Sequence, residues 1–392
     1  MRAVALCAGV LLVLSGTSDA RSPVTPDGWV GTWGGAAAAG VGEGYANYSI
    51  RNVVHTSVGG SAVRVRLSNR FGTRPAVLGR VSIAVAAASD SPAAVDGTMR
   101  GVTFGGADSI TIPAGAEVLS DQVRLRVPRD GNLLVSTYTP VATGPVTYHG
   151  LATQTSFFTR DGDVALETSG ASYDERTSAW HYVSGVDVRG SGAGGTVVAF
   201  GDSITDGAGA TSGANRRWPD LLADRLGGRL GVVNSGISGN RMLLDGGGFG
   251  INALARFDSD VLDVTGARTV ILLEGINDIQ QTPHQTDPTA IIAAYRQFIG
   301  QAHARGIRVV GGTVLPFKGW QVYDPTLEAT RQALNTFIRA SGEFDAVVDF
   351  DAVMRDAADP LVMRAEYDSG DHLHPNDAGY QAMANAVDLS KL

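Results

Sequence analysis

The hydrophobic pattern of this sequence changes at a short glycine-rich segment, residues 190–195 (GSGAGG). Before the segment, short apolar runs alternate with turn residues, and no helical period is evident. After it, short apolar runs alternate with longer stretches of helical periodicity. Two such patterns in succession predict two domains, and 392 residues are enough for two separate cores. The composition of residues 190–195 is typical of a flexible linker between them.

The pattern before the linker predicts an all-β domain over residues 21–189. Many short strands at this spacing, separated by turn residues, are typical of a β-sandwich or a jelly-roll-like domain. The clearest predicted strands span residues 48–54, 62–67, 81–85, 123–127 and 133–138.

The pattern after the linker predicts a parallel sheet between layers of helices over residues 196–392. The helix predicted at 288–304 carries one apolar stripe, and Asp324 and Pro325 have the residue types of an N-cap and a first helical residue. Further helices are expected near Ala253 and Asn376. The predicted strands are 197–200, 231–233, 269–273, 307–311 and 347–350, and the other predicted helices are 218–226 and 325–339.

Chemically useful residues follow the first three of these strands. Ligands on parallel sheets bind outside the carboxyl ends of the strands. The segments at 201–203, 234–240 and 274–278 each come directly after a predicted strand, and 371–375 precedes the last helix. We therefore expect all four segments to meet at one edge of the sheet.

The residue types in these segments are those that acyl transfer requires. Ser203 is the candidate nucleophile and needs a base to remove its proton. His374 is the candidate base, because imidazole titrates near neutral pH. Asp371, three residues earlier, can orient its ring and stabilise the imidazolium.

An oxyanion would need hydrogen-bond donors aimed at the developing charge. The backbone N–H groups of Ser203 and Gly239 and the side-chain amide of Asn277 are candidates. Each such donor typically contributes about 3 kcal/mol to lowering the barrier.

Each candidate also has a purely structural interpretation. Ser203 could cap a helix, His374 could be an ordinary loop histidine, and Asn277 could belong to a turn. The aspartates near these candidates are expected to bind loop amides or to orient loops rather than to react: Asp202, Asp206 and Asp278. The tryptophans are expected to pack rather than to bind sugars: Trp29, Trp33, Trp180 and Trp320.

A metal site is the remaining alternative for the histidines. His372 and His374 form an H-x-H pair, which can bind zinc. The sequence offers no evident third protein ligand, so no metal and no other cofactor is expected. The order and placement of the four segments favour catalysis over the structural interpretations.

These segments resemble the four sequence blocks of the SGNH (GDSL) hydrolase family: GDSI at 201–204, NSGISGN at 234–240, GIND at 275–278 and DHLHP at 371–375. The resemblance covers about half of the chain, with Ile204 in place of the usual leucine. It implies a flavodoxin-like three-layer α/β/α fold and metal-free ester hydrolysis through an acyl-enzyme. It gives Ser203, Asp371 and His374 the roles of the triad, and Ser203, Gly239 and Asn277 those of the oxyanion hole.

The N-terminal β pattern, together with NRML at 240–243 and LEGIND at 273–278, is similar to a secreted bacterial branch of the family associated with xylan. This resemblance implies a carbohydrate O-acetyl esterase acting on acetylated polysaccharide or small acyl esters. A lipase, phospholipase or broad aryl esterase of the same fold is the alternative. A carbohydrate-binding protein with an inactive second half is the non-enzymatic alternative.

The first residues of the chain predict a signal peptide over residues 1–20 and therefore secretion. Arg2 precedes an apolar run at 3–14, and residues 18–20 (SDA) form a small-x-small cleavage site. That run is too short to cross a bilayer, so no stable membrane insertion is expected. Cleavage would remove Cys7, the single cysteine, so the mature chain would contain no cysteine and no disulfide. A net charge of −8 disfavours a nucleic-acid partner.

Overall fold

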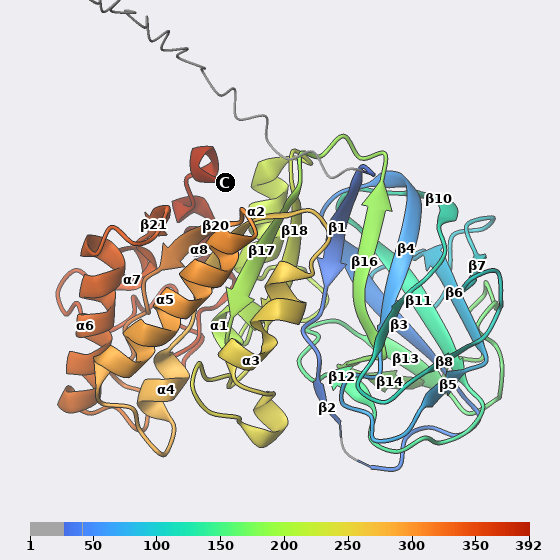
Figure 1. Cartoon of the computed structure of the whole chain (residues 1–392), viewed down its shortest axis with the longest axis horizontal. Helices are drawn as coiled ribbons and strands as arrows, with labels where there is room; N and C mark the ends of the chain where they lie inside the picture. The colour runs from blue at the N-terminus through green and yellow to red at the C-terminus, as the bar shows by residue number, and fades with distance from the viewer. Residues whose placement is uncertain (1–26, 41) are drawn as a thin grey trace, which may run out of the picture.

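A computed structural model describes residues 27–40 and 42–392. The predicted signal peptide, 1–20, lies outside the described residues, as does Cys7. Figure 1 places an N-terminal part made of strands beside a C-terminal part in which helices surround a sheet.

The N-terminal part contains two large antiparallel sheets. One has the order β1-β16-β4-β10, with β9 also paired to β4, and the other has the order β14-β13-β3-β11-β6-β7. Two small sheets have the orders β15-β12-β2 and β5-β8. The strands are β1 (Trp29–Gly34), β2 (Ala38–Ala39), β3 (Tyr48–Thr56), β4 (Gly60–Ser68), β5 (Ala76–Leu78), β6 (Arg80–Val85), β7 (Arg100–Val102), β8 (Ile110–Ile112), β9 (Glu117–Leu119), β10 (Val123–Val127), β11 (Gly131–Thr139), β12 (Thr147–His149), β13 (Ser156–Thr159), β14 (Glu175–Thr177), β15 (Trp180–His181) and β16 (Val183–Arg189).

The two large sheets share one hydrophobic core. Val65 and Val186 from the first sheet and Ile50 and Leu133 from the second are completely buried in the same cluster. Alternating apolar residues on each strand form this common face. The five predicted strands correspond to β3, β4, β6, β10 and β11, each with slightly wider or identical bounds.

The C-terminal part is built on a five-stranded sheet, and its parallel pairing confirms the prediction. The strand order, β18-β17-β19-β20-β21, is the order 2-1-3-4-5 along this part of the chain, as in flavodoxin-like doubly wound sheets. The strands are β17 (Thr196–Gly201), β18 (Gly231–Gly236), β19 (Ala267–Leu273), β20 (Arg308–Gly312) and β21 (Ala346–Val348).

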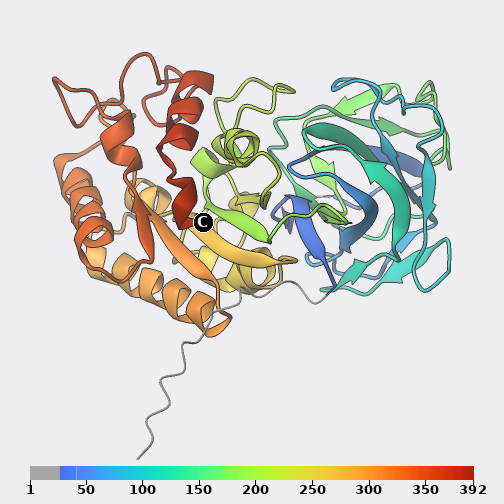
Figure 2. The ribbon, with the colours of Figure 1, turned by 90° about the horizontal axis from the view of Figure 1, so that it is seen from above.

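Helices cover both faces of this sheet (Figure 2). One group contains α2, α7 and α8, and the other contains α3, α5 and α6. The helices are α1 (Ser203–Asp206), α2 (Trp218–Leu226), α3 (Ala253–Phe257), α4 (Ile276–Gln280), α5 (Pro288–Ala304), α6 (Pro325–Ala340), α7 (Phe350–Met354) and α8 (Asp377–Ala386), with short turns η1 (Gly247–Phe249), η2 (Asp258–Leu262) and η3 (Leu389–Lys391). In residues 27–40 and 42–392, no helix combines the length and apolar character needed to cross a bilayer.

The bounds of the longest helices follow from their caps and apolar stripes. α5 begins as predicted at Pro288, where the Asp287 side chain accepts the Thr289 N–H, and it buries Tyr295 and Phe298. Asp324 caps α6 in the same way. The prediction of a strand over 347–350 is wrong at the carboxyl end. β21 stops at Val348, because Asp349 caps the short helix α7.

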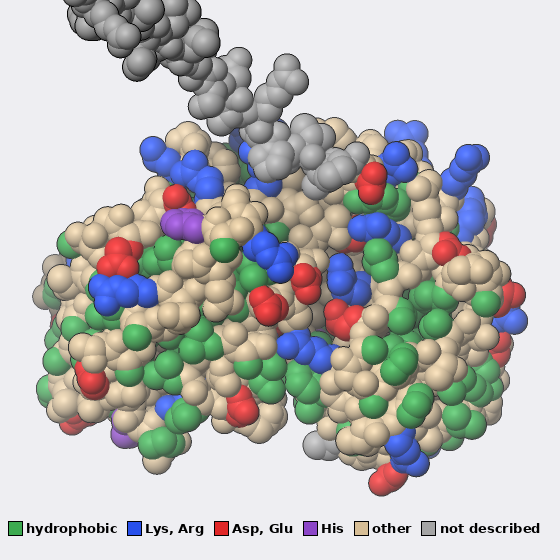
Figure 3. All heavy atoms as spheres, in the orientation of Figure 1, with side chains coloured by type: hydrophobic (Ala, Val, Ile, Leu, Met, Phe, Trp, Pro, Cys, Tyr) green, Lys and Arg blue, Asp and Glu red, His purple; other side chains and the backbone are tan. Residues whose placement is uncertain are grey.

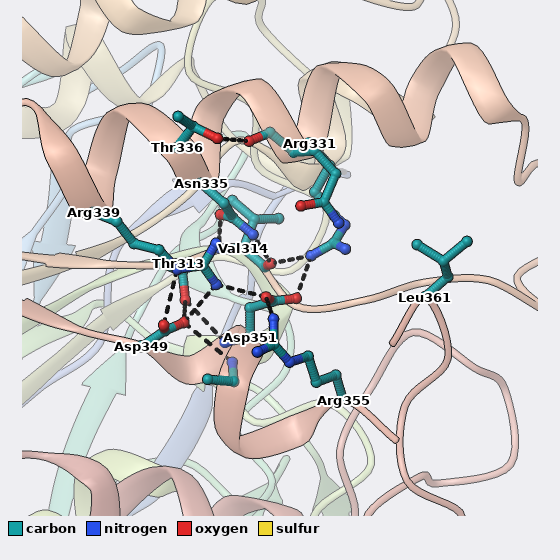
Figure 4. Close-up of polar contacts among 12 residues, drawn as sticks. Thr313, Val314, Arg331, Asn335, Thr336, Arg339, Asp349, Asp351, Arg355 and Leu361 are labelled. Carbon is teal, nitrogen blue, oxygen red and sulfur yellow. Dashed lines mark hydrogen bonds and ion pairs between the residues drawn. The ribbon is translucent and has the colours of Figure 1, made fainter. Parts of the chain in front are cut away.

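A buried ionic network joins α6 and α7 to the segment that follows β20 (Figure 4). Asp351 accepts hydrogen bonds from Arg331 and Arg339, each at 2.6 Å, and Arg331 also donates to the Val314 carbonyl at 2.7 Å. Thr313 donates to Asp349 at 2.9 Å. The network fixes the carboxyl end of β20, where the segment carrying Trp320 begins.

The two parts of the molecule pack closely against each other along β1 and β18. The N–H of Gly31 donates to Thr196 Oγ1 at 3.0 Å, and the N–H of Val232 donates to Ser57 Oγ at 2.9 Å. A Cβ atom at Gly34 would lie 2.5 Å from Val233 Cγ1, so only glycine permits this approach. The predicted linker, 190–195, connects β16 directly to β17. On the face shown in Figure 3, acidic and basic side chains are interspersed over both parts.

Candidate active site

The candidate nucleophile lies at the carboxyl end of the central strand β17. Ser203 is the first residue of α1, and its N-cap is Asp202, whose side chain accepts the Ile204 N–H at 3.0 Å. The interpretation of Ser203 as a helix cap is therefore wrong. As the first helical residue, Ser203 has a backbone N–H without an acceptor inside the helix.

His374 and Asp371 form a continuous hydrogen-bonded chain with Ser203. The Ser203 Oγ lies 2.8 Å from His374 Nε2, and His374 Nδ1 lies 2.6 Å from Asp371 Oδ2. The other oxygen of Asp371 accepts the N–H groups of His374 at 2.8 Å and Leu373 at 2.9 Å. The structure thus brings together the three residues predicted as a triad.

The charge of Asp371 determines which atoms donate and which accept in this series of hydrogen bonds. Burial acts to raise the pKa of Asp371, but the hydrogen bonds from the His374 ring and from two backbone N–H groups outweigh burial and lower it. The carboxylate is therefore ionised at neutral pH and accepts a proton-bearing Nδ1. Nε2 is then left to accept the Ser203 hydroxyl.

The predicted oxyanion donors Gly239 and Asn277 are neighbours in the structure. The side chain of Gln281 donates both to the Gly239 carbonyl at 2.9 Å and to Asn277 Oδ1 at 3.1 Å. Gln280 also donates to Asn277 Oδ1, at 2.7 Å. Among the residues that the structure describes, the buried Asn277 Nδ2 has no hydrogen-bond partner. Such a donor is available to an oxygen atom of a ligand.

The residues that orient Asn277 were missed by the sequence analysis. Gln280 and Gln281 follow Asn277 by three and four residues, so helical spacing could have indicated them. Trp320 donates from Nε1 to Gln280 Oε1 at 3.0 Å, and its ring centroid lies 6.3 Å from that of His374. No spacing rule connects Trp320 to the site.

The tryptophans differ in burial. Of the four tryptophans that were expected to pack, Trp29, Trp33 and Trp180 are buried, as predicted. Trp320 is only half-buried and stands beside His374. It therefore belongs to the surroundings of the site as well as to the packing of its loop.

The aspartates around the nucleophile bind loop amides, as predicted. Asp278 accepts the N–H groups of Met242 at 2.7 Å and Leu243 at 3.0 Å. Asp206 Oδ2 accepts from both the N–H and the hydroxyl of Ser238. These carboxylates hold the segment that contains Gly239.

Asp202 differs from the other aspartates in its ionisation. Complete burial raises the pKa of Asp202 to about 7, against the hydrogen bond from the Ile204 N–H, and the nearby Asp278 carboxylate adds to the rise. The protonated form is favoured because the charged form is removed from water.

Arg256 joins the loops that carry the candidate residues. This buried guanidinium donates to the carbonyls of Gly201 at 2.9 Å and Ser235 at 2.8 Å, and to Asn240 Oδ1 at 2.8 Å. It also reaches Glu274 at 3.3 Å. The segments after β17, β18 and β19 are therefore held by one side chain that the sequence analysis did not identify.

The H-x-H pair is divided between two carboxylates. His372 Nδ1 lies 2.6 Å from Asp368 Oδ2, whereas His374 is bound to Asp371 and Ser203. Within residues 27–40 and 42–392, no group of three or more His, Cys, Asp or Glu side chains is arranged to hold a metal ion.

An exposed aromatic side chain borders the candidate oxyanion hole. Phe249 is 50% exposed, and a Cβ atom at Gly239 would lie 2.6 Å from its ring. Its segment is fixed to the site because the Asn240 side chain donates to the carbonyls of Phe249 at 3.0 Å and Ile251 at 2.8 Å. The ring narrows the space next to Gly239.

Residues 199–382, which include all of the predicted site residues, match the model of the GDSL-like Lipase/Acylhydrolase family. Residues 196–392 contain this match and are called the GDSL domain below because of this similarity. The match identifies the protein as an ester-hydrolysing enzyme. The N-terminal strands lie outside the matched range.

Similar solved structures each cover about half of the chain. A GDSL-like lipase from Bacteroides thetaiotaomicron is 22% identical, with 50% of this chain and 87% of that chain covered and a TM-score of 0.40. A lipase/acylhydrolase from Enterococcus faecalis is 18% identical (49% and 92% covered, TM-score 0.39). A carbohydrate acetylesterase from Sinorhizobium meliloti is 19% identical (49% and 95% covered, TM-score 0.38). No curated protein has significant similarity to this chain.

Proposed function

We propose that the GDSL domain hydrolyses esters through an acyl-enzyme formed on Ser203. The observation that carries this proposal is the chain of short contacts from Ser203 Oγ to His374 Nε2, at 2.8 Å, and from His374 Nδ1 to Asp371 Oδ2, at 2.6 Å. A serine is activated when a base within hydrogen-bond reach is itself oriented by a third group.

In the first half of the reaction, Ser203 Oγ attacks the ester carbonyl carbon while His374 takes its proton. The tetrahedral oxyanion accepts hydrogen bonds from the N–H groups of Ser203 and Gly239 and from Asn277 Nδ2. His374 then gives its proton to the leaving alcohol, and the acyl group remains on Ser203. In the second half, water attacks the acyl carbonyl while His374 takes its proton; the bond to Ser203 Oγ then breaks, His374 returns the proton to Oγ, and the carboxylic acid leaves.

We further propose short acyl groups as substrates, with O-acetylated carbohydrate as the leading class. Phe249 lies against Gly239, and on this proposal its ring limits the length of the acyl chain beside the oxyanion. The resemblance of the N-terminal β pattern and of residues 240–243 to xylan-associated esterases supports the same class. Lipid and aryl esters are the alternative, because the chemistry recognises the carbonyl group rather than the acyl tail.

The predicted signal peptide at 1–20 supports a proposal of secretion, which fits a polymeric substrate outside the cell. N-terminal sequencing of protein recovered from the culture medium of the native host tests this proposal directly. A mature chain that begins close to residue 21 supports it. Protein confined to the cells with residues 1–20 intact contradicts it.

The Ser203→Ala variant tests the proposed mechanism. We expect turnover of p-nitrophenyl acetate to fall by at least about 10³-fold, because the proposed acyl-enzyme forms on the Ser203 hydroxyl. Ser341→Ala, at the exposed end of α6, is the matched control and should keep full activity. Undiminished turnover by Ser203→Ala, with an unchanged unfolding curve, would refute the proposal.

Comparison of acetyl, butyryl and octanoyl esters, of phospholipids and of acetylated xylan then tests the substrate class. Rates that fall with chain length, together with release of acetate from xylan, are expected. Rates that peak at octanoyl esters or phospholipids would favour the lipase alternative.

A further inference from the structure

His149, on strand β12 of the N-terminal part, is buried against the GDSL domain. Only 4% of its surface is exposed. Its Nε2 lies 2.9 Å from Oδ1 of Asp206, the last residue of α1. A side chain from outside the GDSL domain therefore contacts the short helix that begins with Ser203.

The surroundings of the His149 ring require both of its nitrogens to carry protons. Nδ1 faces the Ala36 carbonyl at 2.8 Å, and Nε2 faces the Leu151 carbonyl at 3.1 Å as well as Asp206. All three partners are acceptors. Burial acts to lower the pKa of His149, but Asp206 and the two carbonyls outweigh burial and raise it. The hydrogen-bond geometry and the raised pKa of His149 therefore both indicate that the ring is a protonated imidazolium.

Asp206 connects this imidazolium to the oxyanion hole. Its second oxygen accepts the N–H of Ser238 at 2.9 Å and the Ser238 hydroxyl at 2.7 Å. Ser238 is followed directly by Gly239. One carboxylate therefore binds His149 on one side and the oxyanion segment on the other, and it sits on the same helix as Ser203.

The His149 ring is itself held in place by the N-terminal part. Trp180 packs against it with a centroid separation of 5.2 Å and an interplanar angle of 34°. Trp180 in turn donates from Nε1 to the Val53 carbonyl at 2.7 Å, in the centre of β3. Asp206 is thus held in place relative to the core of the β sheets, through His149 and Trp180.

We infer that His149 is a positioning residue of the active site, which acts through Asp206 to align Ser203 and the Gly239 N–H. The N-terminal part then completes the catalytic unit rather than only adding a surface for substrate. This inference rests on the proposed function of Ser203. A misplacement of reacting groups by about 1 Å can cost about 100-fold in rate.

The test compares His149→Gln and Asp206→Asn with wild type in the full chain. Active sites are first counted with a fluorophosphonate, and kcat and KM for p-nitrophenyl acetate are then expressed per titrated site. We expect kcat to fall about 10- to 100-fold with KM changed less than about threefold. Inhibition by phenylboronic acid, which binds as a tetrahedral adduct, should weaken in parallel. The double variant should lose no more than the worse single variant, because the two residues act as one unit.

His303→Gln is the matched control. His303 forms a comparable contact with Asp345, at 2.8 Å, on the exposed side of α5, and its loss should leave kcat per site unchanged. If His149→Gln keeps kcat per site within about twofold while its unfolding midpoint falls, His149 is only structural and the inference is overturned. Full activity of Ser203→Ala would instead overturn the proposed function, so the two failures are distinguishable.

Discussion

Each part of the molecule contains a fully buried arginine that binds backbone carbonyls. Arg51, in the N-terminal part, donates to the carbonyls of Pro92 at 2.6 Å and Glu167 at 2.8 Å. Arg256, in the GDSL domain, donates to those of Gly201 and Ser235. The two guanidinium carbons lie at the same distance, 4.1 Å, from an aromatic ring, Tyr173 for Arg51 and Phe200 for Arg256.

The difference lies in what the bound loops carry. The loops held by Arg51 contain no candidate catalytic group, whereas those held by Arg256 contain Ser203 and Gly239. In both places a buried cation satisfies several carbonyls, but only Arg256 does so beside the candidate catalytic residues. Stability and turnover should therefore separate when the two parts are perturbed.

The largest difference in kcat between two variants is expected within one motif of the GDSL domain, DHLHP at 371–375. His374→Ala should lower kcat by about 10⁴-fold, because the base is lost. His372→Ala, two residues away, removes a side-chain contact with Asp368 and should change kcat less than about threefold. Steady-state kinetics with p-nitrophenyl acetate measure both. Equal losses of kcat in the two variants would show that His374 has been wrongly assigned as the base.

Substitution of the two buried arginines by lysine tests the comparison itself. Both Arg256→Lys and Arg51→Lys should lower the free energy of unfolding, by about 2–4 kcal/mol, because lysine cannot satisfy the same set of carbonyls. Only Arg256→Lys should also lower kcat per titrated site, by about 10-fold. Urea unfolding and active-site titration separate the two effects. A similar fall in kcat per site for Arg51→Lys would contradict the division of roles.

The smallest effect concerns the pH dependence of stability through Asp202. Its pKa of about 7 in the folded protein exceeds the ordinary value of 3.8, so the folded state binds the proton more tightly than the unfolded state. The resulting stabilisation is present at low pH and is lost as pH rises from about 4 to 7. Asp202→Asn removes this titration while an amide oxygen still caps α1.

Urea unfolding of wild type and Asp202→Asn at a series of pH values measures this effect. The stability of the variant relative to wild type should increase as pH rises through this range. A difference between the two proteins that is independent of pH would show that Asp202 does not titrate there.

The sequence was most informative where function follows from local rules. Caps and apolar periodicity placed α5 and α6, and the rule that ligands bind at the carboxyl ends of parallel strands brought Ser203 and His374 together across 171 positions. The end of β21 was misplaced because the apolar run continues through Phe350, while Asp349 caps a helix.

Two residues that support the site, unlike Gln280 and Gln281, follow no spacing rule. Arg256 and His149 contact segments far apart in the chain, and each binds two backbone carbonyls, which have no signature in the sequence. An isolated histidine at the end of a short strand resembles any other loop histidine until its three acceptors are seen. Such positioning residues therefore require a structure to be identified.

The central claim is tested most directly by trapping the covalent intermediate. Rapid acid quenching of the enzyme with p-nitrophenyl acetate, followed by proteolysis and mass spectrometry, locates any acyl group on the chain. We expect one acetyl group on the peptide that contains Ser203, and none on that peptide in Ser203→Ala. An acetyl group that forms at the catalytic rate on another residue, with Ser203 unmodified, would contradict the account.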